Sequence, residues 1–160
     1  MMIGTANVNS LTAAYRLATL IPLFLFALYD HRHHLIRNAA LLAFLPWCLL
    51  YFPVSLLSGR LPVGIICESL LGFLAGGALL LMICLVTNGG IGGGDIKLVA
   101  LLGIPLGLSG ILLLLLLSCL LALLHVALLD MVKGSTPASI PFAPYLFAGY
   151  LGLVLFPLML

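Results

Sequence analysis

The sequence predicts an all-α, polytopic membrane protein with about six transmembrane helices. Hydrophobic residues make up 64% of the 160 positions and charged residues only 6%, which is too little polar surface for a water-soluble globule. A bilayer-spanning helix needs about 20 apolar residues. Division of the chain at its polar breaks gives six apolar segments, at residues 11–29, 39–57, 61–86, 96–108, 111–129 and 142–160. No loop is long enough to form a soluble domain, so we expect one helical domain over residues 1–160.

Basic residues predict how these segments cross the membrane. Residues 1–10 show neither a basic cluster nor a convincing cleavage site, so we expect the first segment to be retained rather than removed as a signal peptide. The loops after the first, third and fifth segments carry four of the six basic residues, namely Arg32, Arg37, Lys97 and Lys133. Loops rich in Lys and Arg stay in the cytoplasm, which places both termini on the opposite face. A net charge of +2, scattered along the chain, argues against nucleic-acid binding.

Cysteines and paired glycines are interpreted as packing features. The four cysteines lie inside apolar segments and form no Cys-x-x-Cys pair, so we expect buried, small hydrophobic side chains rather than a zinc or redox site; they are Cys48, Cys67, Cys84 and Cys119. Two glycine pairs have the spacing that lets transmembrane helices approach closely. These pairs are Gly72 with Gly76 and Gly103 with Gly107.

The stretch from Gly89 to Lys97 is the strongest candidate for a reaction site. Five of its first six residues are glycine, and Asp95 follows them at the mouth of an apolar segment. Ionisable groups at membrane depth are costly and are usually retained for function, and glycines let another backbone approach closely. Asp30 ends the first segment at the same predicted face. Antiparallel helices packed about 8 to 10 Å apart can bring the two carboxyls together.

Two carboxyls that share a site repel each other when both are ionised, so the pair holds one proton. This is the arrangement of aspartic proteolysis, in which the ionised member takes a proton from water and the protonated member polarises the peptide carbonyl. Asp95 precedes its helix, where the macrodipole favours an anion, whereas Asp30 ends its helix. We therefore expect Asp30 to carry the shared proton.

Spacing alone leaves other readings open. Asp95 is equally compatible with a helix N-cap, and Asp30 with an interfacial charge beside Arg32. Lys97 is most simply a topology determinant that extends to the interface.

The remaining polar groups are assigned to supporting roles. Glu68 lies in the outer part of the third segment, where we expect it to pair with Arg60 or with a polar group between helices. Asp130, near Lys133, is the one rival for a place in the acidic pair. The histidines that follow Asp30 lack the i, i+4 spacing of a metal site, so we expect a basic loop that attracts anionic lipid head groups; they are His31, His33 and His34.

Three motifs then resemble those of the type IV prepilin peptidases, a family of intramembrane aspartic proteases with six transmembrane helices. Residues 92–97 (GGGDIK) resemble the family's Gly-x-Gly-Asp-x-Lys signature. Asp30, with Ile36 and Asn38 downstream, resembles its first motif, an Asp followed by Ile-Pro-Asn. Residues 141–146 (PFAPYL) are similar to the Pro-Phe-Gly-Pro-type motif that opens the last helix. The motifs occur in the right order and extend over most of the chain.

The resemblance implies roles for eight residues. Asp30 and Asp95 are the catalytic dyad, and they activate water without a metal or other cofactor. The other six support the site: Gly92 and Gly94 leave room for the substrate backbone, while Asn38, Lys97 and the turn from Pro141 to Pro144 position it. Two departures put local backbone geometry in question, because Arg37 stands where the family commonly has proline and Ala143 where it commonly has glycine.

The implied function is that of a bacterial inner-membrane endopeptidase that removes the basic leader of prepilin or pseudopilin substrates at the cytoplasmic face. Longer, bifunctional members have a region with two Cys-x-x-Cys pairs and also methylate the new amino terminus. Without such pairs, this chain resembles the short, peptidase-only members that serve Flp or tight-adherence pili. Two alternatives stay open: a small proton- or cation-coupled transporter subunit, and an inactive assembly factor that binds prepilins.

Overall fold

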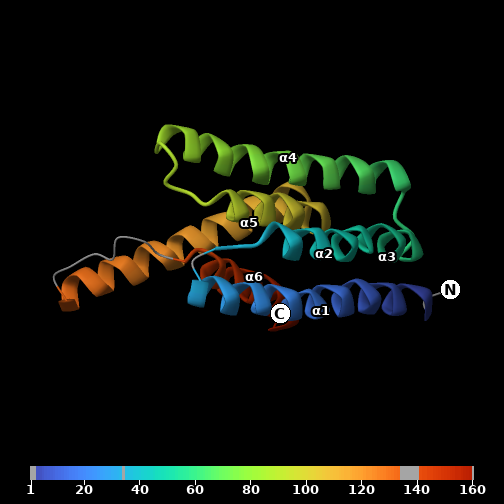
Figure 1. Ribbon diagram of the computed structural model, residues 1–160. Coiled ribbons are helices and arrows are strands. Elements are labelled where there is room, and N and C mark those ends of the chain that lie inside the picture. Colours follow the sequence, from blue (N-terminus) through green and yellow to red (C-terminus); the bar gives the residue numbers. More distant parts are fainter. Residues whose placement is uncertain (1–2, 34, 134–140, 160) are drawn as a thin grey trace.

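The computed structural model describes residues 3–33, 35–133 and 141–159, and every regular element in them is helical. The all-α prediction is therefore confirmed for the described part of the chain. In chain order the helices are α1 (Ile3–His33), α2 (Asn38–Leu49), α3 (Tyr51–Leu57), α4 (Pro62–Val86), α5 (Gly93–Lys133) and α6 (Ala143–Met159). They pack along one another as a bundle (Figure 1).

Several helices are suited to a membrane. Four stretches are long and apolar enough to cross one, and the second of them combines α2 and α3: Leu11–His33, Asn38–Leu57, Pro62–Val86 and Gly93–Met131. The apolar part of α6, Ala143–Leu155, is shorter. Large apolar side chains on the bundle surface are exposed, for example Leu85 at 71% and Leu116 at 63%, as expected where lipid is the solvent. The protein is a multi-pass membrane protein, while the count of six spans stays a prediction.

Helix α5 folds back on itself at Gly107. This residue has φ 68 and ψ −175, which is outside the helical region and suits glycine. A Cβ atom placed on Gly76 would lie 3.1 Å from the side chain of Val99 and 3.0 Å from that of Ile111. An unbroken helix would separate Val99 and Ile111 by about 18 Å. The two halves of α5 therefore run in opposite directions, and the break falls where the fourth predicted segment ends.

The paired glycines pack as predicted. A Cβ atom on Gly72 would collide with the carbonyl oxygen of Gly103 and would lie 2.9 Å from the Cα of Gly107, so the backbones of α4 and α5 touch directly. The expectation for the cysteines is only partly right. Cys48 is buried and Cys84 is half-buried, but Cys67 and Cys119 are exposed. Their helix faces point out of the bundle, where an apolar thiol costs little in lipid.

The chain reversals gather the three motifs at one end of the bundle. The end of α1, the loop into α5 and the start of α6 lie toward the left in Figure 1, and the segment that leads into α2 starts from there. The opposite end holds the start of α1 and the connection from α3 to α4. Segments that are far apart in sequence and carry the candidate residues are thus gathered toward one end of the bundle.

Candidate active site

Asp30 is held at the meeting point of α1 and α6. Its side chain is only 4% exposed, and its Oδ2 accepts a hydrogen bond of 3.1 Å from the backbone N–H of Ala143. Ala143 is the first residue of α6, where backbone N–H groups have no partner within the helix. The start of α6 therefore supplies both a donor and the positive end of a helix dipole to the Asp30 carboxylate.

The proline-rich motif shapes this helix start. The carbonyl of Phe142 accepts the N–H groups of Tyr145 and Leu146, at 3.1 and 3.2 Å, and so closes the first turn. Pro144 lies within that turn, where its missing N–H breaks no helical hydrogen bond. Pro141 lies just before it and is half-buried. The motif thereby leaves the Ala143 N–H free to bind Asp30.

Asp95 lies in the first turn of α5 and is half-buried. The carbonyl of Gly92 accepts the N–H groups of Asp95 and Ile96, at 3.1 and 3.3 Å, which fixes the start of the helix. Its carboxylate interacts electrostatically with that of Asp30. Its Oδ1 is buried and has no hydrogen-bond partner among the described residues. The structure therefore brings the two predicted carboxyls into one site.

The structure gives Asp30 a hydrogen-bond donor that its place at the end of α1 did not suggest. We expected Asp30, at the end of its own helix, to hold the shared proton. The structure places Asp30 at the amino end of a second helix, α6, with an N–H donor. Such a donor stabilises the ionised form of a carboxyl, whereas burial without a donor disfavours it. The contact with α6 joins residues far apart in sequence and is not visible in the local pattern.

The glycines before Asp95 have distinct surroundings. A Cβ atom on Gly94 would lie 2.7 Å from the Cβ and 3.0 Å from the carbonyl oxygen of Ile36, so this glycine admits the chain between α1 and α2. We expected Gly94 to leave room for substrate, but Ile36 fills that space. A Cβ atom on Gly92 would lie 3.1 Å from Oδ2 of Asp95, and one on Gly93 would have nothing within 4 Å. Gly92 thus keeps the Asp95 carboxylate uncrowded.

Asn38 and Lys97 bind each other across the site. The Lys97 ammonium donates a hydrogen bond of 2.9 Å to Oδ1 of Asn38, and the contact is exposed. It joins the first residue of α2 to the second turn of α5. Lys97 therefore contacts α2 and not Asp95, in agreement with its place on the opposite side of the helix.

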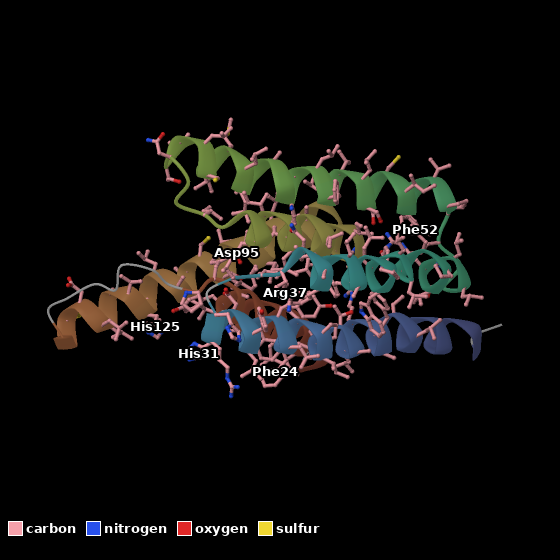
Figure 2. All side chains as sticks on the ribbon, in the orientation of Figure 1. Phe24, His31, Arg37, Phe52, Asp95 and His125 are labelled. Carbon is pink, nitrogen blue, oxygen red and sulfur yellow. The ribbon has the colours of Figure 1, made fainter. Side chains whose placement is uncertain are left out.

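The two departures from the family motifs leave the backbone intact. Arg37 has φ −72 and ψ 134, which are values that proline also adopts. Among the described residues other than glycine, only Asn88 has a positive φ. The backbone at position 143 therefore does not require glycine, and alanine adopts it without strain. Figure 2 shows Arg37 beside the start of α2 and Asp95 at the start of α5.

The other acidic residues lie outside this site. Nη2 of Arg60 lies 2.7 Å from Oε2 of Glu68, so that predicted pair is confirmed. With side chains 42% and 54% exposed, the pair is a surface contact. Asp130 is exposed near the end of α5. Of the predicted histidine loop, His31 and His33 are exposed at the end of α1, whereas His34 lies outside the described residues.

The backbone N–H of Ala143 is part of the candidate site but was not predicted from the sequence. Ala143 attracted notice only as a departure from glycine. The available signal was its position at the start of an apolar helix, since the first N–H groups of a helix need outside partners. Which group would accept that N–H depended on the tertiary fold.

Comparison with known proteins identifies the family of this chain. The type IV leader peptidase family matches residues 17–127, more than two thirds of the chain, which includes both aspartates but not the motif from Pro141. The chain is also similar to the prepilin leader peptidase/N-methyltransferase of Bacillus subtilis (strain 168), with 35% identity over 130 residues. That alignment covers 79% of this chain and 49% of the relative, so the chain spans about half of the relative's length. No solved structure matches the chain. The chain belongs to the type IV leader peptidase family.

Proposed function

We propose that the protein is a membrane-embedded aspartic endopeptidase that cleaves the leader of prepilin-like substrates. The observation that carries this proposal is the pair formed by Asp30 and Asp95. One carboxyl has an N–H donor, and the other has a buried oxygen without a partner in the described part of the chain. Family membership supports the same activity. The relative's name adds the substrate, a prepilin leader.

In the proposed reaction Asp30 is ionised and Asp95 is protonated. The Asp30 carboxylate takes a proton from water, and the water oxygen attacks the carbonyl carbon of the scissile peptide bond. Asp95 gives its proton to the carbonyl oxygen. Collapse of the tetrahedral intermediate then breaks the carbon–nitrogen bond, and the proton on Asp30 passes to the leaving amine. The Asp95 carboxylate takes back a proton from one hydroxyl of the intermediate as that oxygen becomes the carbonyl of the new carboxylic acid. Both carboxyls return to their starting states after release of the two products.

We further propose that cleavage occurs at the cytoplasmic face of the bacterial inner membrane. Exposed basic residues at the site's end of the bundle support this orientation, among them Arg32, Arg37 and Lys97. A basic leader in the cytoplasm would reach the dyad from this face, whereas the apolar segment that follows it would stay in the bilayer.

Flp-type prepilins are the proposed substrates, and peptide cleavage without methylation is the proposed activity of these 160 residues. The basis is that the four cysteines form no Cys-x-x-Cys pair. Cys48 lies in α2, Cys67 and Cys84 lie well apart in α4, and Cys119 lies in α5. Mass spectrometry of the mature pilin tests this point. A methylated amino terminus made by the purified chain alone would refute it.

The deciding experiment combines the full chain in nanodiscs with a Flp-type prepilin and, separately, with a longer type IV prepilin. We expect a product shortened by the leader, in the presence as well as the absence of EDTA, and none with Asp95→Asn. Absence of cleavage of every prepilin by a membrane-inserted, correctly folded chain would contradict the proposed function. Loss of cleavage with EDTA, restored by one metal, would replace the aspartic mechanism.

A further inference from the structure

A groove of about 700 Å³ lies between α1 and α2. The residues that define it include Ala18, Leu25 and Tyr29 on α1, Arg37 just before α2, and Ala40 and Ala43 on α2. We refer to it as the α1–α2 groove. Its rim is accessible from the side of the bundle, since Leu25 is 60% exposed. An apolar ligand in the membrane can therefore reach it laterally.

The groove is closed at the end remote from the dyad. Tyr15 of α1 stacks on Trp47 of α2, with ring centroids 6.0 Å apart. The Tyr15 hydroxyl donates to the Trp47 carbonyl oxygen at 3.0 Å, and Nε1 of Trp47 donates to Oγ1 of Thr19 at 3.1 Å. These contacts hold α1 against α2 near Trp47. The groove begins next to them and continues toward the motif end of the bundle.

The other end of the groove adjoins the candidate active site. Phe26 lines the groove and lies one helical turn before Asp30, on the same face of α1. Arg37 lines it on the opposite wall, directly after Ile36, which packs against Gly94. An extended segment that leaves the groove at this end thus arrives at the dyad.

The length of the groove and the small side chains along one wall allow a transmembrane helix to pack in it with one face. From Ala18 to Tyr29 the groove follows α1 for about 16 Å, which is half of a hydrocarbon core about 30 Å thick. The opposite wall presents the exposed alanines Ala39, Ala40 and Ala43. Small side chains of this kind let a second transmembrane helix approach closely.

From this continuity we infer that the α1–α2 groove seats the apolar helix of the substrate, over the half of the bilayer nearest the dyad. The inference rests on the proposed function. A substrate whose scissile bond lies at Asp30 and Asp95, and whose apolar helix follows that bond, would place its first three turns along the groove. A lipid acyl chain is the competing occupant, because it too is apolar, but it gains nothing from the groove's connection to the dyad.

Photocrosslinking tests the location of the substrate helix without requiring cleavage. A prepilin with a photoreactive amino acid in the first three turns of its apolar helix would be incubated with the Asp95→Asn variant in nanodiscs. We expect adducts on residues 18–29 and 37–47. Adducts confined to α4 or α5, to a second copy of the prepilin, or to lipid alone would overturn the inference. The wild-type chain's cleavage of the same prepilin reports separately on the proposed function.

Filling the groove gives a second, kinetic test. Ala43→Trp places a large side chain in the groove, and Ala78→Trp is the matched control, because Ala78 is exposed on α4. We expect Ala43→Trp to raise KM for a full prepilin about tenfold, which corresponds to about 1.4 kcal/mol, and to spare cleavage of a short peptide that spans only the leader junction. Equal effects of both variants, or no effect of Ala43→Trp in a folded chain, would overturn the inference.

Discussion

The backbone N–H of Ala143 donates a hydrogen bond to Oδ2 of Asp30, although the two residues are 113 positions apart. This bond places the amino end of α6 against the carboxyl end of α1. It also gives the Pro-Phe-Ala-Pro motif a chemical task, since the motif starts the helix whose first N–H stabilises the Asp30 carboxylate. The three motifs therefore converge on the dyad through different means: a carboxyl each from α1 and α5, and a backbone donor from α6.

The two dyad residues are expected to be indispensable. Asp30→Asn and Asp95→Asn each keep a similar shape but remove the base or the acid, so each should lower kcat about 100-fold or more. Asp130→Asn is the matched control, because Asp130 is exposed and outside the site. Prepilin cleavage in nanodiscs, with membrane insertion verified, measures the effect. Near-normal activity of either dyad variant would reject the assignment.

Gly94 and Gly93 should respond differently to the same substitution. In Gly94→Ala the new methyl group would meet Ile36 at 2.7 Å and push the loop between α1 and α2 away from α5. In Gly93→Ala the methyl group would have nothing within 4 Å. We expect kcat to fall about tenfold or more for Gly94→Ala and to stay within about twofold for Gly93→Ala, since small-to-large changes in tight contacts cost about 1–3 kcal/mol. Equal rates for the two variants would show that the Ile36 contact is unimportant.

The hydrogen bond between Lys97 and Asn38 should contribute modestly to kcat, and the two residues should share that contribution. Its contact is exposed, so its loss should cost about 1 kcal/mol or less and lower kcat only about two- to fivefold. Asn38→Ala, Lys97→Met and the double variant form a cycle. If the two residues act through this bond, the double variant should be no slower than the worse single variant. If the fold-reductions in kcat of the two single variants multiply in the double variant, the two residues act independently.

Packing between α4 and α5 gives a test of stability rather than activity. A methyl group in Gly103→Ala would collide with the backbone of Gly72, whereas one in Gly152→Ala would have nothing within 4 Å. We expect Gly103→Ala to destabilise the protein by about 1–3 kcal/mol and Gly152→Ala to have little effect. Thermal unfolding in a single detergent compares the two. A Gly103→Ala chain as stable as the wild type would contradict the direct backbone contact.

Local patterns in the sequence were sufficient for much of the fold and for the members of the site. Apolar runs predict the helices, and Gly103 to Gly107 marks the break in α5, because a positive φ at Gly107 requires glycine. Asp30 and Asp95 stand out because charge is so scarce in this chain. Their common depth follows from the alternation of helix directions.

What the sequence could not supply are contacts between distant elements. The donor to Asp30 comes from α6, and the residue that fills the space beside Gly94 comes from the loop before α2. Neither partner is close in sequence, so the local pattern did not indicate the donor to Asp30 or the contact that fills the space beside Gly94. The exposure of Cys67 and Cys119 was missed for a similar reason. Apolar composition identifies a membrane helix but not which of its faces contacts protein.

The dyad should give a bell-shaped dependence of kcat/KM on pH, and Ala143 should control its acid limb. Activity is lost at low pH when the base of the dyad becomes protonated, and at high pH when its acid loses the shared proton. Ala143→Pro removes the N–H that stabilises the Asp30 carboxylate and puts a ring carbon in its place, so the carboxylate loses its donor and must also move away from α6. Without this donor the anion is less stable, so the acid limb should move to higher pH while the alkaline limb moves less. Ala143→Gly keeps the N–H and serves as the control. Movement of the alkaline limb alone in Ala143→Pro would exchange the roles of the two aspartates, and an unchanged profile would show that the bond from α6 does not influence the reaction.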